Sequence, residues 1–238
     1  KIKKQKNYDF IEISGKKIIK PFNYNVPSDI SSSSFFIVLT ALTKKSELKI
    51  KNVNINPSRT GILKILNKMG VKIDLKNTTT YKGEKIADLI VKGKNSFKPI
   101  NCPTKLNSAA IDEFLLIFLI AAKAKGISYF RELSELNKKE SPRLDIAVQF
   151  LKSIGVKVKR HDNDIKIYGN PKLDLKGKYV IKNFKKDHRI FMMTCVAALT
   201  LGGEFEIYDK DSINTSFPNF LKLLKKLGAK LNWKIEEK

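Results

Sequence analysis

The sequence is poor in cysteine, histidine and arginine, and it has no long apolar run. Its two cysteines, Cys102 and Cys195, stand far apart, which excludes a disulfide framework and a cysteine-rich metal site. The longest apolar runs, 114–122 and 191–201, are shorter than the roughly 20 residues of a membrane-spanning helix. With 42% hydrophobic residues, the chain can still bury a core. We therefore expect a globular cytoplasmic protein that does not insert into a membrane.

A formal net charge of +24 on 238 residues would suit a nucleic-acid-binding protein. The basic residues argue against this function, because only five of the 47 are arginine, the residue that makes bidentate contacts to phosphate and guanine. The aromatic residues Phe35, Phe36 and Phe217 fall in apolar helical patterns and do not alternate with basic residues as a stacking platform requires. We predict that the protein binds no nucleic acid.

A repeated pattern runs through the chain. Three segments end in a helical stretch, a glycine and then alternating apolar residues: KILNKMGVKI (64–73), QFLKSIGVKV (149–158) and KLLKKLGAKL (222–231). Gly70, Gly155 and Gly228 stand where a left-handed residue caps a helix, and the residues after them are typical of a half-buried strand. Upstream of these segments we expect apolar helices at 31–42, 112–124 and 188–201, and short strands at 48–53, 127–131 and 204–208. Some repeats add a further strand, as at 165–168, and the whole order predicts an α/β (α+β) fold around a shared core.

The polar motifs lie at the expected starts of these helices. First helices begin at Asp29 with Ser31, at Asp112, and at Asp187 with His188 and Arg189; second helices begin at Ser58 with Arg59, at Lys139 to Arg143, and at Thr215 with Ser216. Equivalent helix starts in repeated units should lie on the same side of a domain. Their free N–H groups and positive dipole ends favour anions, and the cations placed there should deepen the attraction. We therefore predict a surface that binds phosphate or carboxylate groups.

Two of these motifs combine acids with bases. Residues 139–143 (KESPR) bring a lysine, a carboxylate and an arginine into one turn, and residues 187–189 (DHR) join an acid, an imidazole and a guanidinium. Arginine suits carboxylate or phosphate because its planar fork donates two parallel hydrogen bonds. The two clusters indicate catalysis on a doubly anionic substrate.

Six motifs in order along the chain resemble the C-terminal half of the 5-enolpyruvylshikimate-3-phosphate synthase family. They are VPSDISSSSFF (26–36), NPSRTG (56–61), IDE (111–113), KESPR (139–143), DHR (187–189) and TSFPNF (215–220). The resemblance implies repeated units of the βαβαββ type that form one domain of an inside-out α/β barrel of the enolpyruvyl transferase type. It implies transfer of the enolpyruvyl group of phosphoenolpyruvate to the 5-hydroxyl of shikimate 3-phosphate, with no metal and no redox cofactor.

The resemblance also implies a division of the chain. Residues 1–27 would be the tail of the partner domain and the hinge, and residues 28–238 the C-terminal domain, with repeats at about 28–100, 101–175 and 176–238. The family's lysine, serine and arginine motifs of the N-terminal domain have no counterpart here. The missing domain would act in cis or in trans, the complete enzyme is expected to be a monomer, and this half alone is expected to be inactive.

The resemblance assigns catalysis to two acids. Asp112 matches the aspartate that contacts the attacking hydroxyl, where a carboxylate can accept a proton; the alternative is a helix-capping acid favoured by the dipole. Glu140 matches the glutamate that transfers a proton at the methylene group; the alternative is an exposed first-turn glutamate. Flanking cations would keep Glu140 ionised unless burial or substrate raises its pKa.

The remaining site residues are expected to bind substrate. Lys139, Arg143 and Arg189 match residues that hold anionic groups, and His188 matches a neutral donor near phosphoenolpyruvate, its cationic form disfavoured by the helix dipole. Thr215 stands where some members have a lysine. We expect Asp187 to cap its helix and orient Arg189, and the second histidine, His161, to lie on the surface. Ser31 to Ser34 should pack at a helix start near the hinge, and Arg59 should act as an anchor at its own helix start.

Two alternatives remain open. The same architecture occurs in UDP-N-acetylglucosamine enolpyruvyl transferase and in RNA 3′-phosphate cyclase, so fold alone does not fix the substrate. The KES and DHR clusters favour the shikimate enzyme over both. The non-enzymatic alternative is a lysine-rich α/β binding module without catalysis, in which Glu140 and Asp112 would matter only for stability.

Overall fold

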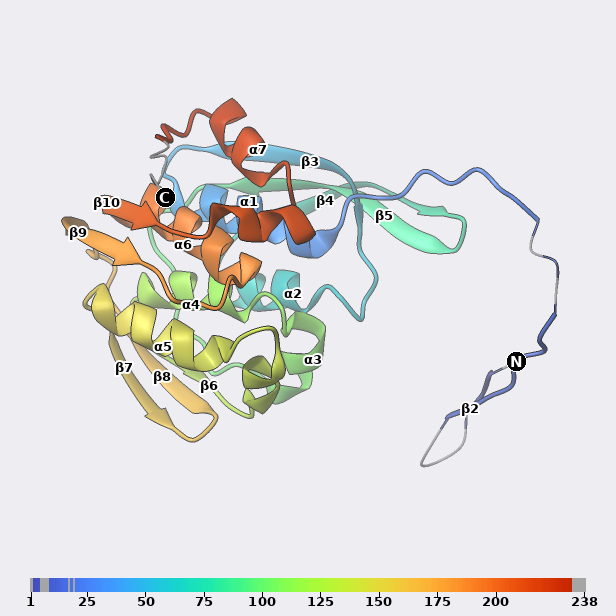
Figure 1. The fold of residues 1–238 in the computed structure, drawn as a ribbon, viewed down its shortest axis with the longest axis horizontal. Helices are drawn as coiled ribbons and strands as arrows, with labels where there is room; N and C mark the ends of the chain where they lie inside the picture. The colour runs from blue at the N-terminus through green and yellow to red at the C-terminus, as the bar shows by residue number, and fades with distance from the viewer. Residues whose placement is uncertain (1, 5–8, 17, 19, 233–238) are drawn as a thin grey trace, which may run out of the picture.

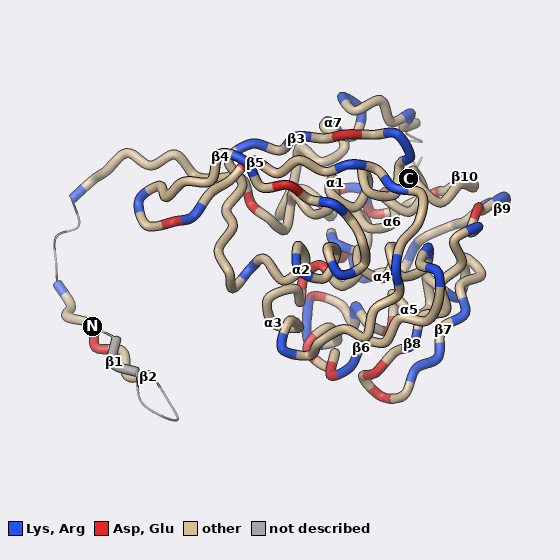
Figure 2. The backbone as a smooth tube through the Cα atoms, turned by 180° about the vertical axis from the view of Figure 1, so that it is seen from behind, with Lys and Arg blue, Asp and Glu red and all other residues tan. Residues whose placement is uncertain are grey.

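The computed structural model describes the chain except residues 1, 5–8, 17, 19 and 233–238. Its core is a group of helices in mutual contact, α1 (Ile30–Leu42), α4 (Phe114–Ala122) and α6 (His188–Leu201), each packed against a sheet on the outside (Figure 1). All nine residues of α4 are buried, as expected for a helix that is apolar on every side. The fold is thus an α/β domain with helices inside and sheets outside. Figure 2 shows lysine and arginine residues along much of the backbone, whereas the buried helices α1 and α4 contain none.

The second helix of each repeat packs around these three helices and buries its apolar side chains in the same core: α2 (Gly61–Lys68), α5 (Arg143–Ser153) and α7 (Phe220–Lys226). Short helical pieces connect the larger elements: η1 (Thr104–Leu106), α3 (Asn107–Ala110), η2 (Ser134–Lys138) and η3 (Lys210–Thr215). In the part of the chain that the structure describes, no helix is long and apolar enough to cross a membrane.

The first two repeats build equivalent antiparallel sheets. The first has the order β3-β5-β4, from β3 (Glu47–Asn54), β4 (Ile73–Tyr81) and β5 (Glu84–Lys92). The second has the order β6-β8-β7, from β6 (Gly126–Phe130), β7 (Lys157–His161) and β8 (Asp164–Gly169). The third differs, because β9 (Leu175–Ile181) and β10 (Gly202–Ile207) form a parallel pair.

The predicted glycine caps are confirmed. Gly70, Gly155 and Gly228 have φ of +87°, +80° and +95°. In each case the next residue donates its N–H to the carbonyl five positions earlier: Val71 to Leu66 (2.9 Å), Val156 to Leu151 (2.9 Å) and Ala229 to Leu224 (3.0 Å). This is the 6→1 bond of a Schellman cap, which a residue with a Cβ atom closes only under strain.

The strand predicted after Gly228 is wrong within the described residues, because 229–232 carry no strand. In the first two repeats the strand after the glycine pairs with the strand that follows it, β4 with β5 and β7 with β8.

Asp88, on β5, forms hydrogen bonds to two β-bulges in the first sheet, one on each neighbouring strand. The register shifts between Ile50 and Val53 on one side of β5, and between Lys76 and Thr79 on the other. Asn52 and Asn77, both with positive φ, lie at these shifts. The Asn52 N–H donates to one Asp88 carboxylate oxygen (3.0 Å), and the Asn77 amide donates to the other (2.9 Å). Lys49 pairs with the same carboxylate at 2.9 Å, so one buried acid satisfies both bulges.

The segment before α1 leads away from the domain (Figure 1). Strands β1 (Ile2–Lys4) and β2 (Asp9–Ile11) pair antiparallel at its far end. Nearer the domain, the tip of the β4–β5 hairpin holds the segment: Lys82 lies over the rings of Phe22 and Tyr24 (5.6 and 5.7 Å), and the Tyr81 hydroxyl accepts from the Asn25 N–H (3.1 Å). Ser28 then exchanges backbone hydrogen bonds with β3, and the domain boundary expected there stays a prediction.

Candidate active site

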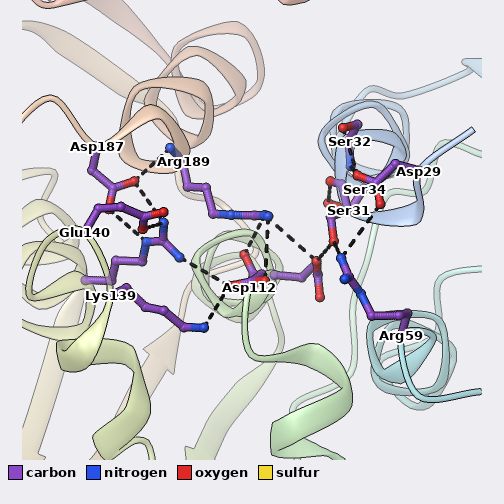
Figure 3. A network of polar contacts seen from close by, with 12 residues as sticks. Asp29, Ser31, Ser32, Ser34, Arg59, Asp112, Lys139, Glu140, Asp187 and Arg189 are labelled. Atoms are coloured by element: carbon purple, nitrogen blue, oxygen red, sulfur yellow. Dashed lines mark hydrogen bonds and ion pairs between the residues drawn. The ribbon is translucent and has the colours of Figure 1, made fainter. Parts of the chain in front are cut away.

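Three helix starts bring most of the predicted site residues together. Asp112 lies in the turn between α3 and α4, Lys139 to Arg143 lie at the entry to α5, and Arg189 lies in the first turn of α6. Figure 3 shows these side chains pointing toward one another in one polar network. The three helix starts are 27 to 77 positions apart in sequence, and the repeated units place them on one side, as expected from the sequence.

Asp112 is the centre of this network. Its carboxylate lies 3.3 Å from Nη1 of Arg143, 3.4 Å from Nζ of Lys139 and 3.7 Å from Nη2 of Arg189. Burial raises the pKa of the Asp112 carboxyl, but the three cations together outweigh burial and hold it below its ordinary value. Since α4 begins at Phe114, Asp112 does not cap the helix. The alternative of a helix-capping acid is therefore wrong.

Arg143 is the most buried cation of the network, with a side chain only 1% exposed. Nε and Nη2 donate to the Asp187 carboxylate at 2.8 and 3.4 Å, Nη1 reaches Asp112, and Nη2 also pairs with Glu140. Its donors therefore face three carboxylates of the same chain. The predicted contact of Arg143 with substrate stays a prediction, but in this structure the guanidinium holds Asp112 and Glu140.

Asp187 caps α6 as expected, accepting from the backbone N–H groups of Arg189 (2.9 Å) and Ile190 (3.4 Å). The expectation that it orients the Arg189 side chain is wrong, because its carboxylate binds Arg143 and Ser141 Oγ (2.8 Å) instead. Burial raises the pKa of the Asp187 carboxyl, but Arg143 and the other donors hold it below its usual range. Arg189 turns the other way, toward Asp112.

The two residues at the entry to α5 are more open. Glu140 pairs with Arg143, yet its side chain is 57% exposed. The Lys139 side chain is 30% exposed. These are the groups of the network with most freedom to meet a bound molecule.

His188 begins α6 and is half-buried. Burial lowers its pKa, and the neighbouring charge of Arg189 lowers it further, so the neutral imidazole is favoured as expected. The other histidine, His161, is exposed at the end of β7, which confirms the surface position expected for it.

Thr215 lies outside the network. It ends η3, and its hydroxyl donates to the Ser212 carbonyl at 3.0 Å. Among the described residues, no hydrogen bond or ion pair joins it to Asp112 or its partners. The helix expected to start at Thr215 begins only at Phe220, because Phe217 and Pro218 form a turn in which Phe217 packs on Phe36.

A second group of polar residues adjoins the site, and one of its members, Glu113, was not predicted from the sequence. Glu113, 3% exposed, accepts from Ser31 Oγ at 2.5 Å and lies 3.9 Å from Nη1 of Arg189. Arg59 donates to Ser31 Oγ at 2.7 Å and pairs with Asp29 at 3.7 Å. Arg59, just before α2, thus ties the start of that helix to α1, which agrees with the anchoring role expected of it there. Burial raises the pKa of the Glu113 carboxyl, and Ser31 and Arg189 only partly offset this.

The charges of the site nearly cancel. Three cations (Lys139, Arg143 and Arg189) face four carboxylates (Asp112, Glu113, Glu140 and Asp187) within the same network. Each of these cations already has an acid within 4 Å, so the network itself carries no surplus of positive charge, and the attraction for anions expected of them stays a prediction. Helix starts and groups outside this network must contribute to any strong binding of anions.

The chain is similar in sequence to one protein family along most of its length. The sequence profile of the family described as EPSP synthase (3-phosphoshikimate 1-carboxyvinyltransferase) matches residues 1–224. A 3-phosphoshikimate 1-carboxyvinyltransferase of Ruthia magnifica is 37% identical over 226 residues, which are 95% of this chain and 51% of that protein. One of Zymomonas mobilis is 38% identical over 221 residues, 92% of this chain and 49% of that protein. The chain thus spans about half the length of these curated relatives.

Solved structures show the same relation. EPSP synthase from Acinetobacter baumannii superposes with a TM-score of 0.82 and 32% identity, over 95% of this chain and 51% of that one. The enolpyruvyl transferase NikO from Streptomyces tendae superposes with a TM-score of 0.64 over 84% of this chain and 43% of that one. At 17% identity, the second likeness concerns the fold alone.

Proposed function

The chain belongs to the EPSP synthase family, and on that premise we propose that it supplies one half of the active site of a 3-phosphoshikimate 1-carboxyvinyltransferase. The reaction joins the enolpyruvyl group of phosphoenolpyruvate to the 5-hydroxyl of shikimate 3-phosphate and releases phosphate. One observation carries the proposal: the Asp112 carboxylate lies within 4 Å of Lys139, Arg143 and Arg189 at neighbouring helix starts.

Asp112 and Glu140 take the two proton transfers. The 5-hydroxyl attacks C2 of phosphoenolpyruvate while the methylene carbon gains a proton, and the tetrahedral adduct then loses phosphate and a proton. Asp112, held ionised by three cations, orients the hydroxyl through a hydrogen bond and accepts its proton as the C–O bond forms. Glu140 has the exposed carboxyl of the network and can reach a bound methylene group, give a proton and take it back.

Lys139, Arg189 and His188 bind the anionic groups of the substrates. Lys139 and Arg189 lie on two sides of Asp112, and His188 offers a neutral imidazole beside Arg189. Thr215 offers only a hydroxyl and lies apart from the network. Arg143 is assigned to substrate binding as well, and its buried guanidinium also orients Asp112 and Glu140. Most of the rate enhancement comes from these groups, which are already in position to stabilise the negative charge of the reacting substrates.

The second half of the site comes from the domain that precedes Ser28. Residues 1–27 are the tail of that domain and the hinge, and residues 28–238 form the C-terminal domain with repeats at about 28–100, 101–175 and 176–238. The near cancellation of charge in the network supports this division, since two substrates rich in negative charge need further cations. Closure of the two halves would supply those cations and exclude water.

A phosphate-release assay tests the proposal. The chain is mixed with both substrates, alone and with a separately produced N-terminal half of an EPSP synthase. We expect release only with both halves, and a loss of about 100-fold in Glu140→Gln. Glu135→Gln, which removes an exposed acid paired with Lys138 in η2, is the matched control and should keep full activity. Absence of release from two halves that are folded and assembled would refute the proposal.

A further inference from the structure

Glu113 is a buried carboxylate that the proposed reaction does not use. Its side chain is 4% exposed, and it lies beside the proposed acid Asp112 at the start of α4. A buried carboxylate is costly unless donors or cations compensate it. Ser31 Oγ at 2.5 Å and Arg189 Nη1 at 3.9 Å are the compensating groups in this structure.

The direction of the hydrogen bonds is fixed by chemistry. Arg59 Nη2 lies 2.7 Å from Ser31 Oγ, and a guanidinium can only donate. With Glu113 ionised, its carboxylate can only accept, so the single hydroxyl proton of Ser31 points to it across 2.5 Å. Glu113 thus accepts from Ser31 on one side and attracts Arg189 on the other.

Arg189 is held between two consecutive acids. Its Nη1 donates to the Asp112 carbonyl at 3.2 Å and its Nη2 lies 3.7 Å from the Asp112 carboxylate. Among the described residues, Asp112 and Glu113 are the two carboxylates within 4.0 Å of this guanidinium. Figure 3 shows Arg189 reaching toward Asp112 from α6, while Arg59 approaches Ser31 from the opposite side.

The same network reaches the point where the N-terminal segment enters the domain. Asp29 caps α1 through the Ser32 N–H at 2.8 Å and pairs with Arg59 at 3.7 Å. The preceding residue, Ser28, is bonded to β3. A continuous set of contacts therefore runs from the entry of α1, through Arg59, Ser31 and Glu113, to Arg189.

We propose that Glu113 is a positioning residue that holds the Arg189 guanidinium beside Asp112 and joins it, through Ser31 and Arg59, to the entry of α1. The idea rests on the proposed function, in which Arg189 binds an anionic group of phosphoenolpyruvate. The packing of the segment before α1 against the domain then determines the direction in which the Arg189 guanidinium points.

Kinetics of the two assembled halves test the role of Glu113. Glu113→Gln fits the same space and can still accept from Ser31, but it cannot pair in charge with Arg189. We expect the KM for phosphoenolpyruvate to rise about tenfold, while the KM for shikimate 3-phosphate stays within about twofold. The control is Glu47→Gln, which removes an exposed acid paired with Lys92 on β3, and it should change neither constant.

A double-variant cycle tests whether the contacts act as a unit. Ser31→Ala should raise the same KM, and Ser31→Ala combined with Glu113→Gln should cost little more than the larger single effect. Full additivity, or a Glu113→Gln enzyme that behaves as Glu47→Gln does, would overturn the positioning role while leaving the proposed function intact.

A measurement on the chain alone keeps the inference testable if the assembled halves release no phosphate. The chain has only five arginines, so the Arg189 Nε–H signal can be assigned in a nitrogen–proton NMR spectrum by substitution. We expect slow rotation of this guanidinium in the wild type and faster rotation in Glu113→Gln, with Glu47→Gln unchanged. Equal rotation in all three proteins would overturn the positioning role.

Discussion

Replacing Arg143 by methionine should destabilise the fold strongly, because it leaves a carboxylate buried without its main partner. The Arg143 side chain is 1% exposed, and that of its partner Asp187 is fully buried. Loss of one member of a buried ion pair costs about 3–5 kcal/mol in free energy of unfolding. The control is Arg160→Met, which removes an arginine that is 30% exposed and paired with Asp145; such a pair contributes about 0–1 kcal/mol.

The difference between wild type and Arg143→Met should depend on pH in a definite direction. In the wild type the Asp187 pKa is lowered, so its contribution is present above the ordinary value of 3.8 and is lost as the pH falls through the lowered value. Without Arg143, burial dominates and raises that pKa. The cost in Arg143→Met is then greatest near pH 7 and shrinks toward pH 4 as Asp187 becomes protonated.

Urea unfolding followed by circular dichroism at pH 7 and pH 4.5 measures both effects. Adding Asp187→Asn to Arg143→Met should recover part of the loss, roughly 1 kcal/mol or more, because asparagine still caps α6 but carries no charge. A loss in Arg143→Met no larger than in Arg160→Met would refute the reasoning. So would a deficit that grows as the pH falls.

Three further substitutions test other parts of the fold. Hydrogen bonds from Lys49 and the bulge residues lower the Asp88 pKa from its ordinary value of 3.8 to about 2. Asp88→Asn should therefore lower the urea midpoint at pH 7, and its stability should fall less than that of the wild type as the pH drops from 3.8 to about 2. An unchanged acid dependence would contradict this. Gly155→Ala meets no atom within 4 Å, so its cost should come from the positive φ alone, about 1–2 kcal/mol by calorimetry; no loss would mean that the cap relaxes. Lys82→Ala removes the contacts with Phe22 and Tyr24, so chymotrypsin should cut after these residues about 2–5 times faster. An unchanged rate would show that these contacts do not hold the N-terminal segment against the hairpin.

Much of the fold follows from local sequence. Gly70, Gly155 and Gly228 mark helix ends because only glycine adopts positive φ without strain, and the wholly apolar stretch 114–122 marks a buried helix. The third repeat departs from the pattern because a strand depends on a partner as well as on its own alternation. Residues 229–232 have the alternation and no partner among the described residues.

The site was predictable only in part. The clusters at 139–143 and 187–189 stand out because arginine is scarce and the charged residues are contiguous. Which side chains pair within the clusters could not be predicted from the sequence: the Asp187 carboxylate binds the side chain of Arg143, 44 positions away, and not that of its neighbour Arg189. Glu113 was missed because its partner Ser31 lies 82 positions away. The signal that could have found it is a run of four serines in an otherwise apolar helix, whose buried hydroxyls need partners.

The two bulges that meet at Asp88 also protect the first sheet against misalignment. A strand that slips by two residues keeps every side chain on its proper face, so the alternation of apolar and polar residues cannot exclude that error. Asp88 can exclude it, because its two oxygens accept from Asn52 and Asn77 on the two neighbouring strands. A slip of either strand would leave a buried acid opposite the wrong donor. One carboxylate thus fixes the alignment of three strands, and with it the direction in which the β4–β5 hairpin projects toward the N-terminal segment.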